Sequence, residues 1–529
     1  MCEEVAQMNI LMNPSAFWLA TSLFALLAFA PLQDKGAVKP EKGRQEMASE
    51  EKVRQTAVAG SFYPADPKVL SAMMDNYLAK VTGPPVPNAN LDPILAVVAP
   101  HAGYEYSGPV AAYTYAALKG HKYARVVIIA PSHYVSFDFS SIYDGDAYAT
   151  PLGNVPVDKA FARELQKMSS TMQLSSQGHD PTSAGGEHAI EVQLPWLQKV
   201  LGNFEIVPIV MGDQSYENSR ALGVALAKLI KAGGKEGETL VLASSDLSHY
   251  HPYDDAETID HKTLDALQAW DYFSMSRNFQ SRIWEACGGA PIVAAMIYAE
   301  RMGANQARVL KYANSGDVTG DKSRVVGYSA DVFVKANGGK AVETPFSLSE
   351  PEKSELLALA RKSVEYVVGK DELYMPPASA DATLNQERGA FVTLTVSGAL
   401  RGCIGYTAPI KPLYLTVRDT ATHAALHDPR FPPVTAAELP GLAYEISVLS
   451  PLRRVTDIQQ IRVGEHGLLM KNGDSEGLLL PQVPVEQNWD RQTFLEQTCR
   501  KAGMGSGCWK DEDTDIFAFT AVVFNEHKF

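Results

Sequence analysis

Cysteine is scarce in this chain, with 5 in 529 residues. The cysteines stand far apart, except for Cys499 and Cys508, which are close enough in sequence to form a local pair. A disulfide framework is built from closely spaced cysteines in a short secreted chain, so this composition excludes that class of fold. Nothing in the sequence requires the local pair to form.

Clusters of positive charge are also missing. The formal net charge is −14, and no long run of basic residues occurs. Phosphate backbones are bound by clustered Lys and Arg, so the sequence excludes a general nucleic-acid-binding protein. The hydrophobic content of 46% and the charged content of 20% are those of an ordinary globular protein. A chain of 529 residues exceeds what one hydrophobic core supports, so we expect two or three domains.

The sequence lacks an apolar run of the length of a membrane-spanning helix, which needs about 20 residues. The apolar stretch from Phe17 to Ala30 is shorter and fits the core of a signal peptide, with Ala28 and Ala30 as a cleavage site. The residues before it include Glu3 and Glu4 but no Lys or Arg, so the usual basic start is missing. We expect export or membrane tethering through this segment. The alternative is an anomalous leader on a cytoplasmic protein.

The residue pattern changes along the chain. Strand-like runs alternate with helical stretches such as Val69 to Val81 and Leu222 to Ala232, up to a closing strand at Val325 to Val334, which is typical of α/β architecture. Beyond a small polar segment, Ser349 and Glu352 form a capping box that begins a helix. We therefore expect a leader at 1–32, a polar tether at 33–52, an α/β domain at 53–335, a linker at 336–348 and a second domain at 349–529.

Polar, metal-capable clusters follow three apolar runs of the first domain. ILAVVAP leads to His101, VVIIAP leads to His133, and TLVLAS leads to Asp246 and His249. Such runs are typical of buried parallel strands, and ligands bind at the carboxyl ends of these strands. We expect a central, mostly parallel sheet flanked by helices, with these side chains at one edge. Read alone, the pattern predicts two imidazoles with Asp246 as the natural third ligand.

Two further residues extend this set. His188 begins the helical segment GGEHAIEVQLPWL, and Cys287 precedes a helix in EACGGAPIVAAMIYAERM. A thiolate at a helix N-terminus is favoured by the helix dipole. Two neutral imidazoles and one thiolate form a suitable set of ligands for Fe²⁺, Cu or Zn²⁺.

Structural roles are the alternative for each residue taken singly. A lone histidine after a strand is more often a hydrogen-bonded structural residue, and a lone buried cysteine acts as a small apolar side chain. The carboxylate of Asp246 could cap the next helix. The remaining histidines of this domain have no comparable placement and are expected at the surface: His121, His179, His251 and His261.

The motifs PHAGYEYSG, PSHY, GGEHAIEVQLP, SSDLSHY and CGGAP resemble, in order and spacing, those of the Memo family over 53–335. The resemblance implies a fold similar to the LigB-type extradiol dioxygenases. It also implies a metal held by His101, His133 and Cys287 in a pocket that other polar residues line. Those dioxygenases use two histidines and one carboxylate, so a cysteine ligand argues against ring cleavage and favours redox chemistry with Fe or Cu over Zn. The pocket residues implied are His188, Asp246 and His249.

The second domain carries the motifs LRGCIGY, HDPRFPPV, EISVLSP and GLLLPQV, which resemble the AMMECR family over 349–529. Its alternating strands and intervening helix predict an α+β fold with a sheet that is at least partly antiparallel. Arg401 stands beside Cys403, and a neighbouring cation lowers the pKa of a thiol, so the two form a candidate site. The alternative is a tight bend at Gly402 and Gly405 with Cys403 packed inside.

A Memo-like domain fused to an AMMECR-like domain resembles the AmmeMemoRadiSam system, whose third component is a radical SAM protein. This chain has no CxxxCxxC motif, so that partner is expected to be a separate polypeptide. We expect a metal-dependent redox or oxygenase-like protein that acts on a small molecule or a peptide. In this hypothesis Asp246 and His249 transfer protons or orient the metal ligands, and His188 faces the substrate or bound oxygen.

Two other functions remain open at this stage. The chain could be a non-catalytic metal- or peptide-binding adaptor, because a fold does not determine a function. It could also be a metal-free hydrolase with Cys403 as nucleophile, although no clear histidine base accompanies that residue.

Overall fold

The computed structural model describes residues 51–82, 93–182, 186–234, 236–336 and 346–526, and the chain from Glu51 onward forms one compact unit. The expected leader, nearly all of the tether and most of the linker lie outside these residues. Within the described ranges, no helix combines the length and the apolarity needed to cross a bilayer.

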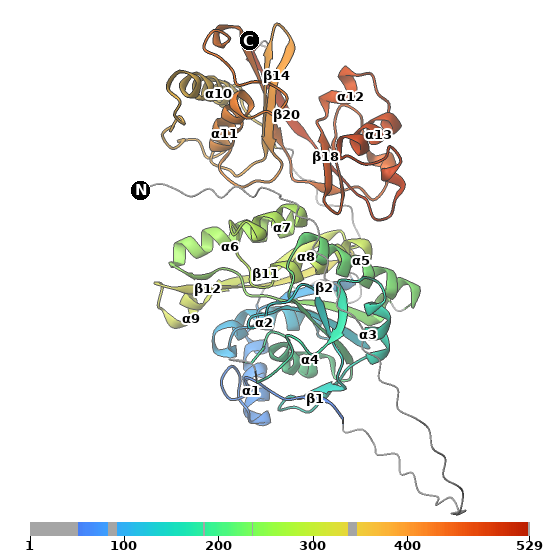
Figure 1. Cartoon of the computed structure of the whole chain (residues 1–529). Coiled ribbons are helices and arrows are strands. Elements are labelled where there is room, and N and C mark those ends of the chain that lie inside the picture. The colour runs from blue at the N-terminus through green and yellow to red at the C-terminus, as the bar shows by residue number, and fades with distance from the viewer. Residues whose placement is uncertain (1–50, 83–92, 183–185, 235, 337–345, 527–529) are drawn as a thin grey trace, which may run out of the picture. The chain divides into compact units, whose positions relative to one another are not determined.

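The N-terminal region, from β1 to β12, is built on a nine-stranded sheet (Figure 1). Its main strand order is β10-β12-β2-β9-β3-β8-β4-β7, and β11 pairs with β12. The three apolar runs of the sequence are the neighbouring strands β2, β9 and β3, and they run parallel. The strands are β2 (Ile94–Ala99), β3 (Arg125–Pro131), β4 (Ser140–Tyr143), β7 (Met172–Ser175), β8 (Glu205–Met211), β9 (Thr239–Ser244), β10 (His249–His251), β11 (Gln306–Asn314) and β12 (Val325–Val334).

The prediction of a mostly parallel sheet is wrong, because the sheet is mixed. Strand β12 runs antiparallel to β2, β10 and β11, and β4 runs antiparallel to β8. β12 runs antiparallel to β11 because their connection is short: only helix α9 (Ser315–Thr319) lies between them. A short connection joins antiparallel strands, whereas a parallel pair needs a longer crossover.

Helices cover both faces of the sheet. In β3, Val126 and Ile128 pack into one hydrophobic core, and Val127 and Ile129 pack into the other. An unbroken apolar run is needed here because alternate residues face opposite, covered sides. The helices are α1 (Pro67–Ala79), α2 (Tyr104–Leu118), α3 (Lys159–Gln166), α4 (Leu194–Leu201), α5 (Tyr216–Ala232), α6 (Tyr253–Gln268), α7 (Tyr272–Gln280) and α8 (Gly289–Arg301).

A small three-stranded sheet supports the start of this region. It has the order β1-β5-β6. The Arg54 guanidinium forms a buried ion pair with Glu191, whose carboxylate also accepts from the Tyr63 hydroxyl at 2.6 Å. These strands are β1 (Val53–Arg54), β5 (Ala147–Tyr148) and β6 (Val155–Pro156).

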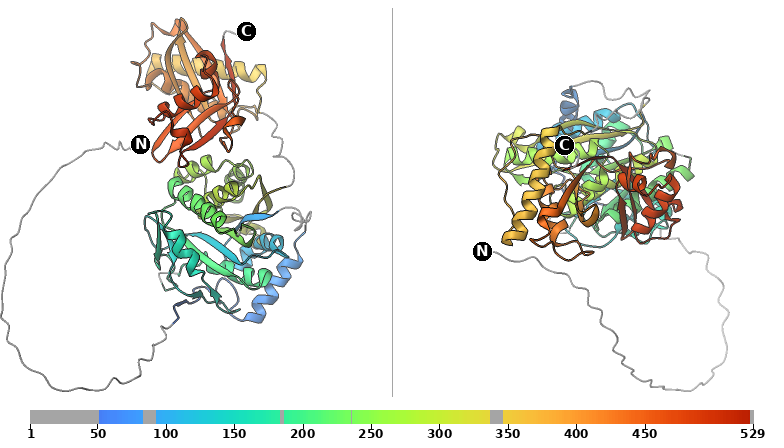
Figure 2. Two further views of the ribbon diagram at one scale, coloured as in Figure 1. Left: turned by 90° about the vertical axis from the view of Figure 1, so that its right-hand side faces the viewer. Right: turned by 90° about the horizontal axis from the view of Figure 1, so that it is seen from above.

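The C-terminal region, from α10 to β20, takes the yellow-to-red end of the colour bar in Figure 2. It contains two four-stranded antiparallel sheets with orders β14-β13-β15-β20 and β16-β19-β17-β18, as expected for an α+β fold. The expected capping box of Ser349 and Glu352 is present at the start of α10. Cys499 and Cys508 form a disulfide. The elements are α10 (Glu350–Lys370), β13 (Ala390–Val396), β14 (Ala399–Tyr406), α11 (Leu413–Leu426), β15 (Leu442–Leu449), β16 (Arg453–Arg454), β17 (Gly467–Asn472), β18 (Ser475–Leu479), α12 (Gln482–Glu486), α13 (Arg491–Lys501), β19 (Asp515–Phe519) and β20 (Ala521–Asn525).

Candidate metal centre

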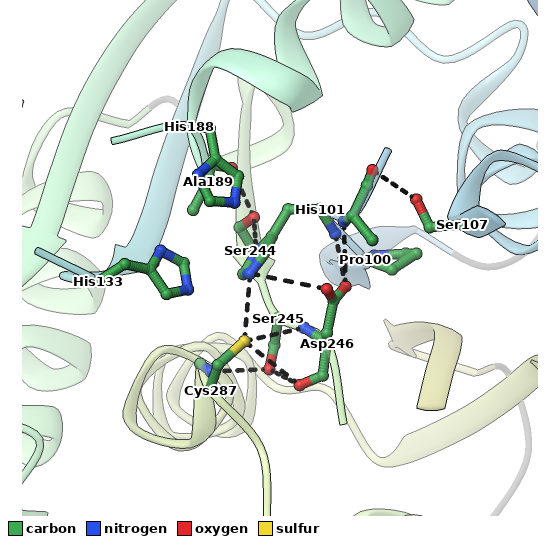
Figure 3. A network of polar contacts seen from close by, with 12 residues as sticks. Pro100, His101, Ser107, His133, His188, Ala189, Ser244, Ser245, Asp246 and Cys287 are labelled. Atoms are coloured by element: carbon green, nitrogen blue, oxygen red, sulfur yellow. Dashed lines mark hydrogen bonds and ion pairs between the residues drawn. The ribbon is translucent and has the colours of Figure 1, made fainter. Parts of the chain in front are cut away.

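Residues from distant parts of the N-terminal region meet at the carboxyl ends of β2, β3 and β9 (Figure 3). His101 follows β2, His133 follows β3, and Asp246 follows β9. His188 comes from the segment before α4, and Cys287 comes from the segment before α8. The parallel arrangement of the three strands explains this convergence, because their carboxyl ends share one edge of the sheet.

Three imidazoles are spaced as metal ligands. His101, His133 and His188 each offer a ring nitrogen, and these nitrogens lie within 4.8 Å of one another. The rings of His133 and His188 are nearly parallel, with centroids 4.9 Å apart. His101 is 2% exposed and His188 is 8% exposed, so little water competes for their nitrogens.

Cys287 adds a sulfur to this cluster. Its Sγ lies 3.2 Å from the Nε2 atom of His101, and the backbone N–H of Asp246 donates to the same sulfur at 3.2 Å. Burial raises the pKa of the Cys287 thiol, while its hydrogen bond with His133 acts in the opposite direction. Nitrogen and sulfur ligands of this kind suit Zn, Cu and Fe, so the residues present fit a transition metal.

Ser244 determines which nitrogen of His101 faces the cluster. The hydroxyl of Ser244 donates to the Ala189 carbonyl at 2.6 Å and accepts from the Gln193 side chain at 2.8 Å. Its oxygen lies 2.9 Å from Nδ1 of His101 and must therefore accept the Nδ1–H. Burial lowers the pKa of His101 well below its usual value, and neighbouring imidazoles lower it further. The ring is neutral, with the Nε2 lone pair directed at the cluster.

Glu187 orients His133 and was missed by the sequence reasoning. Its carboxylate lies 3.0 Å from Nδ1 of His133 and accepts from the backbone N–H of the same residue at 2.8 Å. Burial would lower the pKa of His133, but hydrogen bonds with Cys287 and Glu187 outweigh it and raise the pKa to about 10. Burial likewise opposes ionisation of Glu187, yet His133 lowers its pKa to about 2. The signal available in the sequence was a carboxylate adjacent to His188.

Asp246 and His249 lie beside the cluster. Oδ1 of Asp246 accepts from the backbone N–H of His101 at 2.8 Å, and Oδ2 lies 4.0 Å from His101 Nε2. Burial raises the pKa of Asp246. Nδ1 of His249 donates to the Leu247 carbonyl at 2.8 Å, which leaves Nε2 as the ring nitrogen without a backbone partner in that contact. Asp246 thus holds the segment that presents His101.

A cavity of about 560 Å³ reaches the cluster from one side. Both His249 and Cys287 contribute to its wall, together with Trp284, Arg282 and Gln214. The Gln214 side chain donates to the Cys287 carbonyl at 3.2 Å, which links the cavity wall to the cysteine segment. The cavity therefore adjoins the metal centre through Cys287 and brings His249 to the same wall.

The prediction that His179 lies at the surface is wrong. His179 is 1% exposed, and its ring nitrogens lie 2.5 Å from the Tyr148 hydroxyl and 3.0 Å from the Ser141 carbonyl. These two partners satisfy the imidazole inside the protein, and burial lowers its pKa to about 4. His251 instead pairs with Glu285 at 2.9 Å.

The candidate residues of the C-terminal region have different partners from those expected. The Arg401 guanidinium binds Glu438 at 2.7 Å. A guanidinium that contacts the Cys403 segment is that of Arg430, which donates to the Cys403 carbonyl at 3.2 Å and binds Asp428 at 2.6 Å. Burial raises the pKa of the Cys403 thiol, which favours the thiol over the more nucleophilic thiolate. In the described part of the chain, the thiol hydrogen-bonds with a threonine hydroxyl rather than a histidine base.

Two regions of this chain are similar to known protein families. A family model described as Memo-like protein matches residues 54–332, and one described as AMMECR1 matches residues 357–524. A MEMO1 family protein of Methanopyrus kandleri is 40% identical over 286 residues, which are 53% of this chain and 98% of that protein. One of Sulfolobus acidocaldarius is 39% identical over 285 residues, 52% of this chain and 97% of that protein. A solved structure of an uncharacterized protein from Pyrococcus horikoshii is 40% identical; the match covers 34% of this chain and 95% of that one, with a TM-score of 0.34.

Proposed function

We propose that this chain, which belongs to the Memo-like protein family, is a metal-dependent redox or oxygenase-like protein. Its metal ion is held by His101, His133 and Cys287, with Fe or Cu favoured over Zn. The observation that supports the proposal is the convergence of imidazole nitrogens and a sulfur, with His101 Nε2 and Cys287 Sγ 3.2 Å apart. Thiolate ligation stabilises soft and redox-active metals, which favours electron transfer or oxygen chemistry over simple hydrolysis.

The protein's own residues prepare this site. Ser244 holds the proton of His101 on Nδ1, and Glu187 does the same for His133. His101 is neutral and offers its Nε2 lone pair directly, whereas His133, whose pKa is raised, must lose its Nε2 proton before it can bind a metal ion. The hydrogen-bonded partners raise the basicity of both ligands. When bound, the metal supplies Lewis acidity and a redox couple. Asp246 and His249 act as proton-transfer or orienting residues at the edge of the adjoining cavity.

The alternative role for His188 is that of a third metal ligand. Its ring nitrogen satisfies the same spacing as those of His101 and His133, so a three-histidine set is geometrically available. We assign His188 to the substrate side and Cys287 to the metal. The two assignments differ in one measurable way: loss of the sulfur abolishes metal binding only if Cys287 is a ligand.

Metal analysis of the full-length protein, purified anaerobically, tests the proposal. We expect about one Fe or Cu per chain, with a sharp loss in His101→Ala and Cys287→Ser. The matched control is His261→Ala, an exposed histidine of α6, which should keep the full metal content. Stoichiometric Zn, or no metal, would contradict the redox function. Full metal content in Cys287→Ser would replace the proposed ligand set by the three histidines.

The proposed partner is a separate radical SAM protein of the AmmeMemoRadiSam system, and the substrate is a small molecule or a peptide. The presence of Memo-like and AMMECR1 matches in one chain supports this association. The mixed sheet with helices on both faces is compatible with the LigB-type dioxygenase likeness. Co-elution of the co-expressed proteins in gel filtration tests the partnership, and separate elution under anaerobic conditions counts against it.

A further inference from the structure

A second cavity, of about 530 Å³, lies between α5, α8 and the strand β16 within the compact unit that begins at Glu51. It shares no lining residue with the metal centre or with the cavity beside Cys287. Its wall is made by Ala227, Lys228, Lys231, Trp270, Glu300, Arg301, Gly303, Ala304, Asn305, Arg453, Arg454 and Thr456.

The wall of this cavity is held in place by a buried ion-pair network. Asp515 is 2% exposed and accepts from Arg301 at 3.0 Å and from Arg454 at 3.3 Å. The rings of Phe273, on α7, and Phe517, on β19 with Asp515, pack against each other with centroids 5.1 Å apart. The arginines are therefore positioned before any ligand arrives, which lowers the entropy cost of binding.

Positive charge exceeds negative charge at the surface of the cavity. Glu300 is the acidic residue of the lining, and it already accepts from the Tyr272 hydroxyl at 3.0 Å and lies 3.6 Å from the Arg454 guanidinium. Asp515 lies behind the wall and is shared by several guanidinium groups, Arg220 included. The cationic residues of the lining are Lys228, Lys231, Arg301, Arg453 and Arg454, of which Lys228 also pairs with Glu512 at 3.2 Å.

Two buried donors in the wall have no acceptor among the described residues. One is Nε of Arg301, and the other is the indole Nε1 of Trp270, a residue that is 8% exposed. Buried donors are nearly always paired in folded proteins, so these two are unusual features of the wall, although neither donor atom is itself exposed to the cavity. Burial lowers the pKa of Arg301, and the neighbouring Arg454 lowers it further, while Asp515 acts in the opposite direction.

We propose that this cavity binds a phosphate-bearing small molecule. Guanidinium groups match phosphate oxygens in a bidentate geometry, and Lys adds a point charge, so the lining has the chemistry of a phosphate site. The ligand bridges the two regions of the chain, because Lys231 and Arg301 belong to helices α5 and α8 and Arg453 belongs to β16. Such a ligand stabilises the contact between the regions by mass action.

Calorimetric titration of the full-length protein with inorganic pyrophosphate tests this site. We expect saturable binding that weakens about tenfold in Lys231→Gln, since one charge-assisted contact to phosphate is worth roughly 1.4 kcal/mol. Lys231 is exposed and, unlike Lys228, which pairs with Glu512 at 3.2 Å, it has no ion pair in the described part of the chain, so its replacement leaves the fold intact. The matched control is Lys68→Gln, an exposed helical lysine on α1, which should bind as the unaltered protein does.

The metal centre is a competing site for pyrophosphate, so His101→Ala is titrated in parallel. Retained binding in His101→Ala places the ligand in the basic cavity, and lost binding overturns the proposal. An equal loss in Lys68→Gln and Lys231→Gln, or no binding at all, also overturns it. Equal affinity for citrate and pyrophosphate would overturn the assignment to phosphate. None of these results depends on which metal the other site holds, so the two proposals fail separately.

Discussion

Glu187 and Ser244 show how single residues prepare the metal centre. Each accepts the Nδ1 proton of one histidine, at 3.0 Å for His133 and 2.9 Å for His101. A histidine ligand must be neutral and correctly turned, and such partners are what fix its tautomer. At this scale Cys287 completes the cluster through contacts with both histidines.

Replacing Glu187 by glutamine should weaken metal binding by about 10- to 100-fold, the usual effect of losing a carboxylate that orients a histidine ligand. The amide removes the negative charge that stabilises the His133 ring but keeps the side-chain volume. Competition with a chelator of known affinity measures the change. Glu526→Gln is the matched control, because that carboxylate binds Arg361 at 2.7 Å in the C-terminal region, away from the proposed ligands. Equal affinities of the two variants would contradict the role given to Glu187.

The strands show why the elements could be predicted more reliably than their pairing. The apolar runs predict β2, β3 and β9 correctly, because strands that are covered on both faces need apolar residues at successive positions. The pairing of β12 depends on the connection from β11, which the residue pattern of β12 does not contain. Side-chain partners in the C-terminal region are likewise not visible in the local sequence: Arg401 pairs with Glu438 rather than with the neighbouring Cys403.

Ile129 in β3 tests the contribution of these strands. The side chain is fully buried, so Ile129→Ala should lower the free energy of unfolding by about 2–5 kcal/mol through lost burial and a residual cavity. Urea unfolding followed by circular dichroism measures the difference. Val69→Ala on α1 is the control, since Val69 is 57% exposed and its truncation should cost far less. A similar cost for both variants would show that the strand is not part of the core.

Stability of the whole molecule should depend on pH through Asp331. This residue is fully buried in β12; its Oδ2 accepts from the Ser329 hydroxyl at 2.7 Å, and its Oδ1 has no partner in the described part of the chain. Burial raises the pKa of Asp331 from 3.8 to about 7. The folded state therefore holds a proton that the unfolded state releases, and the contribution of this group to stability is lost as the pH rises from about 4 to about 7.

Asp331→Asn should remove this pH dependence. Above pH 7 the variant should be more stable than the unaltered protein by at least about 1 kcal/mol, because it buries an amide instead of a carboxylate. Below pH 4 the two proteins should differ little. Thermal unfolding at pH 4, 6 and 8 measures the difference. A constant gap in Tm across these pH values would mean that Asp331 does not titrate in this range.

Local sequence pattern determined the strands, many of the helices and the placement of His101, His133 and Asp246 after three apolar runs. These features depend on residues close together in the chain, whose periodicity and capping are visible directly. Tertiary structure alone decided that Glu187 supports His133 from 54 residues away and that Cys287 reaches His101 from 186 residues away. It also decided the burial of His179 and the clustering of basic residues around the second cavity. Such contacts arise from packing between distant segments, and no local pattern of residues encodes them.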